Sequence, residues 1–203
     1  MTIPYYTLII TAILGILCFL YSTNHVFRYY AKFSIYIFVC LVASLIVIPV
    51  AVCRGKGPSN TVLLSYICQT ATSLLGIKFI IEGSEYFTKD ETFIVIANHQ
   101  SCLDVLGLFH VYPLLKRCIF IMKKEILYYI PFGPCLWLCG NVFIPRSKSQ
   151  KSKDILNKTL SKIETEKMKL WIFPEGTRSM GIFLNSRKEV FIWPFQLNYP
   201  FYQ

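Results

Sequence analysis

Two long uncharged stretches stand out in the pattern of hydrophobic and polar residues. Residues 5–23 contain no charged side chain, and their length approaches the roughly 20 residues that span a bilayer core. A second uncharged run covers residues 33–53, and the segment between the two combines cations with aromatic rings, as membrane interfaces do. The pattern predicts two transmembrane helices joined by a short loop. A cleaved signal peptide is disfavoured, because the first run lacks a basic leader and a small-residue cleavage site.

The remainder of the chain alternates between patterns typical of strands and of helices. Short apolar runs predict strands, and apolar residues at every third or fourth position predict helices. We expect strands at residues 77–82, 92–97, 117–122, 140–146 and 170–173, and helices at 60–75 and 147–169 and directly after residue 101. This alternation predicts an α/β domain with a mixed sheet. A turn-rich segment at 55–59 divides the chain into a two-helix membrane anchor (1–57), an α/β domain (58–184) and a tail (185–203).

Composition agrees with a membrane-bound protein. Of the 203 residues, 54% are hydrophobic, which is more than a soluble domain usually carries. The formal net charge of +10 favours anionic partners such as phosphate groups and lipid head groups. Nucleic acid is a weaker candidate, because the basic residues accompany apolar runs of membrane length. The lysines of residues 147–169 form either a solvated helix face or a surface that attracts anionic lipid or the phosphates of CoA.

Eight cysteines are scattered along the chain, and no two of them form a C-x-x-C pair. Several lie in apolar stretches. They therefore indicate buried free thiols in a reducing setting, and neither a disulfide framework nor a zinc site.

The strongest chemical signal lies at the junction of a strand and a helix. His99 follows the apolar run 92–97, Ser101 can cap the next helix, and Asp104 falls in its first turn. An imidazole is the usual general base near neutral pH, and a carboxylate on its second nitrogen fixes its tautomer. No G-x-S-x-G serine motif occurs, so the nucleophile would be a hydroxyl of the substrate. A Cys102–His99 nucleophile of a thioesterase remains the alternative.

Three blocks resemble the motifs of the glycerolipid acyltransferases, in the family's order. Asn98, His99 and Asp104 match the box N-H-x-x-x-x-D. Residues 140–146 match G-x-x-F-I-x-R and end in Arg146, although Pro145 stands where a polar residue is common. Residues 173–178 match F-P-E-G-T-R without a mismatch. The closest form of the family is the microsomal 1-acyl-glycerol-3-phosphate acyltransferases, also called lysophosphatidate acyltransferases.

This resemblance implies a role for each matched residue. His99 would take the proton from the sn-2 hydroxyl of lysophosphatidate as acyl-CoA supplies the acyl group, and Asp104 would hold His99. The expected substrate-binding residues, which receive the phosphate end, are Asn98, Arg146, Glu175, Gly176, Thr177 and Arg178. These residues require no metal or cofactor, and acyl-CoA is a co-substrate. The resemblance further implies a multi-pass protein of the endoplasmic reticulum membrane that serves phospholipid biosynthesis. Acyl-chain preference and other glycerolipid acceptors stay open.

The tail at residues 185–203 is unlike the family, in which an apolar strand ending in V-P-I-x-P follows. The genetic code allows a coding sequence for residues 186–200 whose neighbouring reading frame encodes F-K-K-G-S-F-H-L-A-I-S-T-Q-L-P. This second peptide is the segment that the family has at this place. We hypothesise a slip of the reading frame near Asn185, which leaves the acyltransferase domain incomplete at its C-terminal end. The alternative to an active enzyme is therefore a truncated, inactive, membrane-bound fragment.

The frame hypothesis predicts that the chain as written has little or no acyltransferase activity. Loss of a sheet strand exposes apolar surface, and a site displaced by about 1 Å loses on the order of a hundredfold in rate. Both forms, as written and frame-restored, are to be expressed in a strain that lacks the endogenous enzyme. Full rescue by the chain as written would overturn the prediction. An in-frame transcript of this tail, shared by related genes, would refute the hypothesis of a frame slip.

Overall fold

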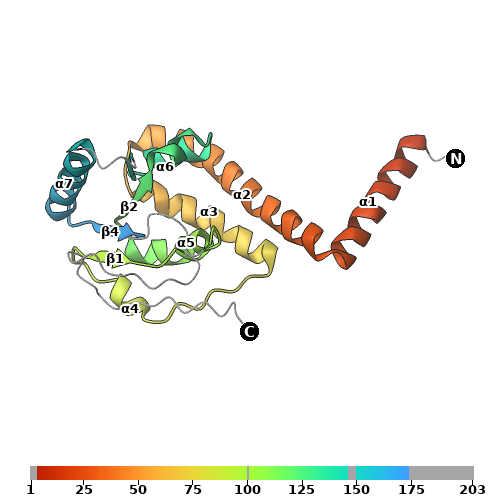
Figure 1. Ribbon diagram of the computed structural model, residues 1–203, viewed down its shortest axis with the longest axis horizontal. Coiled ribbons are helices and arrows are strands. Elements are labelled where there is room, and N and C mark those ends of the chain that lie inside the picture. Colours follow the sequence, from red (N-terminus) through yellow and green to blue (C-terminus); the bar gives the residue numbers. More distant parts are fainter. Residues whose placement is uncertain (1–3, 100, 146–149, 174–203) are drawn as a thin grey trace.

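The computed structural model describes residues 4–99, 101–145 and 150–173. The chain begins with two long helices, α1 (Tyr5–Thr23) and α2 (His25–Arg54), which meet at Asn24. The Asn24 side chain caps α2 by accepting a hydrogen bond of 3.0 Å from the Phe27 backbone N–H. Helix α1 extends away from the rest of the molecule as an arm, and none of its described residues is buried (Figure 1).

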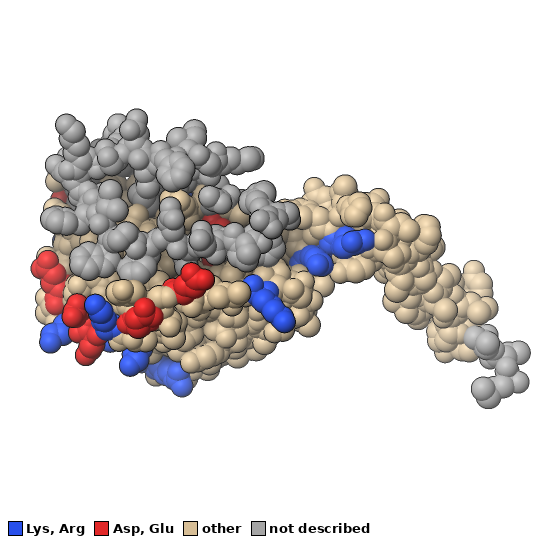
Figure 2. Space-filling model, turned by 90° about the horizontal axis from the view of Figure 1, so that it is seen from below, with Lys and Arg blue, Asp and Glu red and all other residues tan. Residues whose placement is uncertain are grey.

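Both helices are long and apolar enough to cross a membrane, and the most apolar 18-residue segment has a mean hydropathy of 1.9 in α1 and 2.9 in α2. The prediction of an apolar helix at residues 5–23 is confirmed. The second helix is longer than the sequence predicted, because it begins at His25 and continues through Pro49. Seen from below, the arm carries few charged side chains, whereas acidic and basic side chains gather on the α/β domain (Figure 2).

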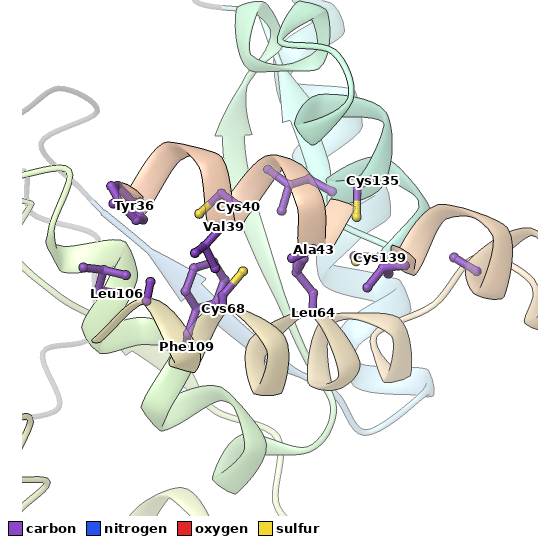
Figure 3. Packing of buried hydrophobic residues seen from close by; sticks show 14 of the residues in the cluster. Tyr36, Val39, Cys40, Ala43, Leu64, Cys68, Leu106, Phe109, Cys135 and Cys139 are labelled. Atoms are coloured by element: carbon purple, nitrogen blue, oxygen red, sulfur yellow. The ribbon is translucent and has the colours of Figure 1, made fainter. Parts of the chain in front are cut away.

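One face of α2 is part of the core of the α/β domain. Helix α2 packs against α3 (Ser59–Leu75) and α6 (Phe132–Leu138), and α5 (Asp104–Leu115) packs against α3 in the same hydrophobic cluster (Figure 3). Ala43, Val47 and Ala51 on this face are fully buried, and their small side chains allow the helices to approach closely. The membrane-length helix and the α/β domain therefore share one hydrophobic core.

The described strands form a four-stranded sheet in the order β1-β4-β2-β3. Their bounds are β1 Ile94–Ile96, β2 Cys118–Lys123, β3 Val142–Ile144 and β4 Lys169–Ile172. All pairings are parallel, with Trp171 of β4 opposite Val95 of β1 and Phe120 of β2. The described strands therefore form a parallel sheet and not the mixed one expected. Helical crossovers connect the strands, and each crossover returns the chain to the end of the sheet at which the previous strand began.

Helices cover both faces of this sheet, as parallel sheets require. The Trp171 face packs against α5 and against Phe87 of the short helix α4 (Ser84–Phe87). The opposite face, with Leu170, packs against Ile163 of α7 (Gln150–Thr165). The remaining element is the 3₁₀ helix η1 (Lys124–Tyr128), which directly precedes α6.

Two local expectations were wrong. Residues 77–82 form no strand, since this segment pairs with no described strand and Ile80 is 75% exposed. Lys169 does not belong to the basic helix face, because it opens β4 and is buried. Its ammonium donates a hydrogen bond of 2.8 Å to the Phe87 carbonyl, and burial lowers the pKa of this lysine.

Asn141 joins the sheet to α6 through a buried side-chain amide. Its Oδ1 accepts a hydrogen bond of 3.0 Å from the Phe120 N–H of β2, and its Nδ2 donates one of 3.0 Å to the Leu136 carbonyl. The Asn141 amide, directly before β3, therefore satisfies two buried backbone groups, the Phe120 N–H and the Leu136 carbonyl.

We expect Asn141→Ala to lower the free energy of unfolding by about 2–4 kcal/mol, because two buried backbone groups lose their partners. Denaturation of the detergent-solubilised protein measures this change. Asn157→Ala on the exposed side of α7 is the matched control and should leave the midpoint nearly unchanged. Equal midpoints for both variants would contradict the assigned role of Asn141.

Candidate active site

The carboxyl end of β1 leads directly into the candidate site. Ala97 extends the pairing with β4, since its N–H donates a hydrogen bond of 3.2 Å to the Ile172 carbonyl. The chain then turns and enters α5 at Asp104. The described residues between β1 and α5, which are 98, 99 and 101–103, thus lie at the carboxyl ends of the parallel strands, where α/β sheets commonly bind ligands.

His99 and Asp104 form a hydrogen-bonded pair across this turn. The distance from His99 Nδ1 to Asp104 Oδ2 is 2.9 Å, and the two side chains are 21% and 8% exposed. The same carboxylate oxygen accepts a hydrogen bond of 2.9 Å from the Ser101 N–H. A carboxylate at Nδ1 holds the proton on that nitrogen, so the lone pair of the neutral ring lies on Nε2. The spacing observed in the sequence therefore produces the geometry of an oriented general base.

Two further contacts fix the turn. Ser101 does not cap α5 as expected; its hydroxyl accepts a hydrogen bond of 3.1 Å from the Leu103 N–H, and α5 begins with no side-chain cap. The Tyr36 hydroxyl of α2 donates a hydrogen bond of 3.3 Å to the Cys102 carbonyl. Sequence reasoning missed Tyr36, because no local pattern indicates a contact between residues so far apart along the chain.

An aromatic ring from β4 packs on the imidazole. Phe173 follows the last residue of β4, and its ring stacks on that of His99 with centroids 4.5 Å apart. The Phe173 ring limits the tilt of the His99 imidazole, while the hydrogen bond from Nδ1 to Asp104 limits its rotation within the ring plane. The ring thus has two independent restraints.

His99 lies on the wall of an apolar cavity of about 370 Å³. Most of the lining comes from aliphatic and aromatic side chains of α5, β2, η1 and α6, among them Phe109, Met122 and Leu136. This volume is within the range of ligand pockets in proteins. An apolar cavity beside an oriented imidazole suits a substrate that combines an aliphatic chain with a reacting hydroxyl or ester.

The structure brings parts of all three motif blocks to this cavity. His99 of the first block, Ile144 and Pro145 of the second, and Phe173 of the third all line it. Asn98 is exposed beside His99. The other predicted substrate-binding residues lie outside the described residues, namely Arg146, Glu175, Gly176, Thr177 and Arg178. Among the described residues, no cluster of His, Cys, Asp and Glu side chains could hold a metal ion.

Comparison with known proteins identifies the family. The profile of the family described as Acyltransferase matches residues 78–201. The chain belongs to this acyltransferase family. The match extends past residue 184, where the sequence analysis ends the domain, and residues 185–203 lie outside the described part of the chain.

Curated relatives from several organisms are named as forms of 1-acyl-sn-glycerol-3-phosphate acyltransferase. The chain is 32% identical over 152 residues to "1-acyl-sn-glycerol-3-phosphate acyltransferase alpha" of Mus musculus, with 75% of this chain and 53% of the relative covered. It is 28% identical over 194 residues to the beta form of Homo sapiens, with 94% and 69% covered. It is 43% identical over 107 residues to "1-acyl-sn-glycerol-3-phosphate acyltransferase" of Saccharomyces cerevisiae, with 52% and 34% covered.

The chain spans about half the length of the first of these relatives. No solved structure matches it.

We expect Asp104→Asn to lower the acyl-transfer rate at least about 10²-fold, because the amide no longer fixes the tautomer or stabilises the imidazolium. The rate is measured in membranes, for the chain as written and for the frame-restored form. Asp154→Asn on the exposed face of α7 is the same substitution away from the site and should be silent. An Asp104→Asn rate near that of the parent would rule out the assigned role.

Proposed function

We propose that this protein transfers an acyl group from acyl-CoA to the sn-2 hydroxyl of 1-acyl-glycerol-3-phosphate, forming phosphatidate in phospholipid biosynthesis. The observation that carries the proposal is the His99–Asp104 pair on the wall of an apolar cavity. The names of the relatives support the choice of acceptor. Acyl-CoA as donor follows from the motif resemblance and from the thioester chemistry that such a base can serve.

The reaction follows from the orientation of the imidazole. His99 Nε2 removes the proton of the acceptor hydroxyl as its oxygen attacks the thioester carbonyl carbon. The imidazolium that forms is stabilised by the ionised Asp104, which itself stays unprotonated. The tetrahedral intermediate then collapses, the carbon–sulfur bond breaks, and the proton on Nε2 passes to the departing thiolate. The new ester and CoA leave, and His99 is neutral again, so no metal or cofactor is consumed.

The apolar cavity would hold an acyl chain with its reacting end at His99. Phe109, Met122 and Leu136 offer only hydrocarbon and thioether surface to such a chain. Burial of aliphatic surface contributes roughly 0.8 kcal/mol for each methylene group, so a long chain gains substantial binding energy there. Chain length and acceptor type would thus be discriminated by how the cavity fills, and a panel of donors and acceptors tests both.

The phosphate end of the acceptor would bind residues that follow the carboxyl ends of β3 and β4, the two strands that flank β2. Arg146 comes after β3, and Glu175, Gly176, Thr177 and Arg178 come after β4, on either side of β2 in the sheet order. An arginine presents a planar fork that binds phosphate in a bidentate manner. Asn98 would contribute from the turn beside His99.

The site of action would be the endoplasmic reticulum membrane. Helices α1 and α2 would anchor the chain there as a multi-pass protein, which keeps the active site next to its lipid acceptor. Extraction with alkaline carbonate separates this proposal from peripheral attachment, because an integral protein stays with the membrane.

We expect His99→Ala to lower the acyl-transfer rate by a factor of about 10² to 10⁴, the usual contribution of a positioned general base. Transfer of labelled acyl groups from acyl-CoA to lysophosphatidate is the measurement. His25→Ala at the exposed start of α2 is the matched control and should keep the parent rate. Near-normal turnover of His99→Ala in an otherwise active form would refute the mechanism.

A further inference from the structure

The turn between η1 and α6 carries three consecutive exposed apolar residues. Tyr128, Tyr129 and Ile130, here called the aromatic tip, are 67%, 65% and 79% exposed. A single exposed hydrophobic residue is normal on a protein surface, but a contiguous apolar patch indicates an interaction site. Tyrosine combines an apolar ring with a polar hydroxyl, and it is enriched where hydrocarbon meets lipid head groups.

The backbone of the aromatic tip is held rigidly. The Gly133 N–H donates a hydrogen bond of 2.7 Å to the Tyr129 carbonyl, and the Ile130 N–H donates one of 3.1 Å to the Tyr128 carbonyl. A Cβ atom at Gly133 would lie 2.3 Å from the Ile126 carbonyl oxygen, so η1 and α6 touch at this point. The three side chains are therefore presented outward by a fixed scaffold.

Helix α6, which follows the aromatic tip in the chain, carries a further exposed aromatic residue and packs on the apolar helix α2. Trp137 of α6 is exposed, and the Lys56 ammonium lies 4.1 Å from the centroid of its ring. Helix α6 packs against α2 (Figure 3). On α2, the apolar side chains of Phe38 and Val52 are exposed. Aromatic rings beside a cation, next to a helix of membrane length, are the composition expected at a bilayer interface.

The aromatic tip also lies next to the cavity. Ile126 and Phe132, which precede and follow it in the chain, both line the cavity that contains His99. A bilayer in contact with the tip would therefore lie beside the cavity wall.

We propose that the aromatic tip, together with Trp137, inserts into the head-group layer of the bilayer and seats the α/β domain on the membrane. The lipid surface is thus contacted by the α/β domain itself as well as by α1 and α2. An acyl chain then passes between bilayer and cavity beside the tip with little exposure to water, a consequence that rests on the proposed function.

A fluorescent reporter at the tip tests this contact without requiring activity. Ile130→Cys, in the full chain with the exposed Cys18 and Cys53 replaced by serine, is labelled with an environment-sensitive dye. The protein is reconstituted into phosphatidylcholine vesicles that contain head-group nitroxide lipid. Asn157→Cys on α7 is the matched control, and the unsubstituted background is labelled in parallel to subtract any residual signal.

The expected result at position 130 is emission at shorter wavelength and quenching by the nitroxide lipid, with neither effect at position 157. Emission at position 130 equal to that at 157 would overturn the proposal. So would a shift to shorter wavelength without nitroxide quenching, because it would mean that protein and not lipid covers the tip.

A second measurement addresses substrate passage. Tyr129→Ser combined with Ile130→Ser should lower severalfold the turnover of a long-chain acceptor embedded in vesicles and spare that of a dispersed short-chain acceptor. Equal loss with both acceptors would contradict passage beside the tip. This measurement uses the frame-restored form. Absence of turnover in that parent would count against the proposed function alone, since the fluorescence result is independent of it.

Discussion

Burial of β4 on both faces is the constraint on which the candidate site depends. Leu170 packs toward α7 and Trp171 toward α5, and both are almost fully excluded from solvent. A central strand fixed in this way has a defined end, and Phe173 beyond that end stacks on His99. The orientation of the imidazole therefore depends on sheet packing as well as on its partner Asp104. Substitutions that loosen the packing on either face of β4 should alter the orientation of the His99 ring before they unfold the domain.

Local sequence patterns predicted the elements that carry their own signal. The apolar runs led to four strand predictions that the structure confirms at β1, β2, β3 and β4, within two residues of their bounds. The spacing of His99 and Asp104 likewise predicted their pairing, because a turn into a helix brings residues five apart within hydrogen-bonding reach. In these places, one short segment contained all the necessary information.

The errors arose where a distant partner decides the outcome. Residues 77–82 have a strand-like composition, but a strand also needs a neighbour for its backbone, and none of the described strands supplies one. The cavity could not be predicted from hydrophobic periodicity either. Periodicity indicates which face of a helix is buried, but it does not indicate the space that remains between α5 and α6. The contact of Tyr36 with the Cys102 carbonyl joins residues 66 positions apart and carries no local signal.

The shared core of α2 has a consequence for handling this protein. The apolar start of the chain resembles a detachable anchor, and trimming at the turn-rich segment after Arg54 is the obvious way to prepare a water-soluble domain. Such trimming would remove the α2 side chains that share a hydrophobic cluster with Leu64, Cys68 and Cys135. It would also remove the hydroxyl that holds the turn between His99 and Asp104. A soluble form is better sought by replacing the outward side chains of α1 and α2 with polar ones, which leaves the inner face of α2 in position.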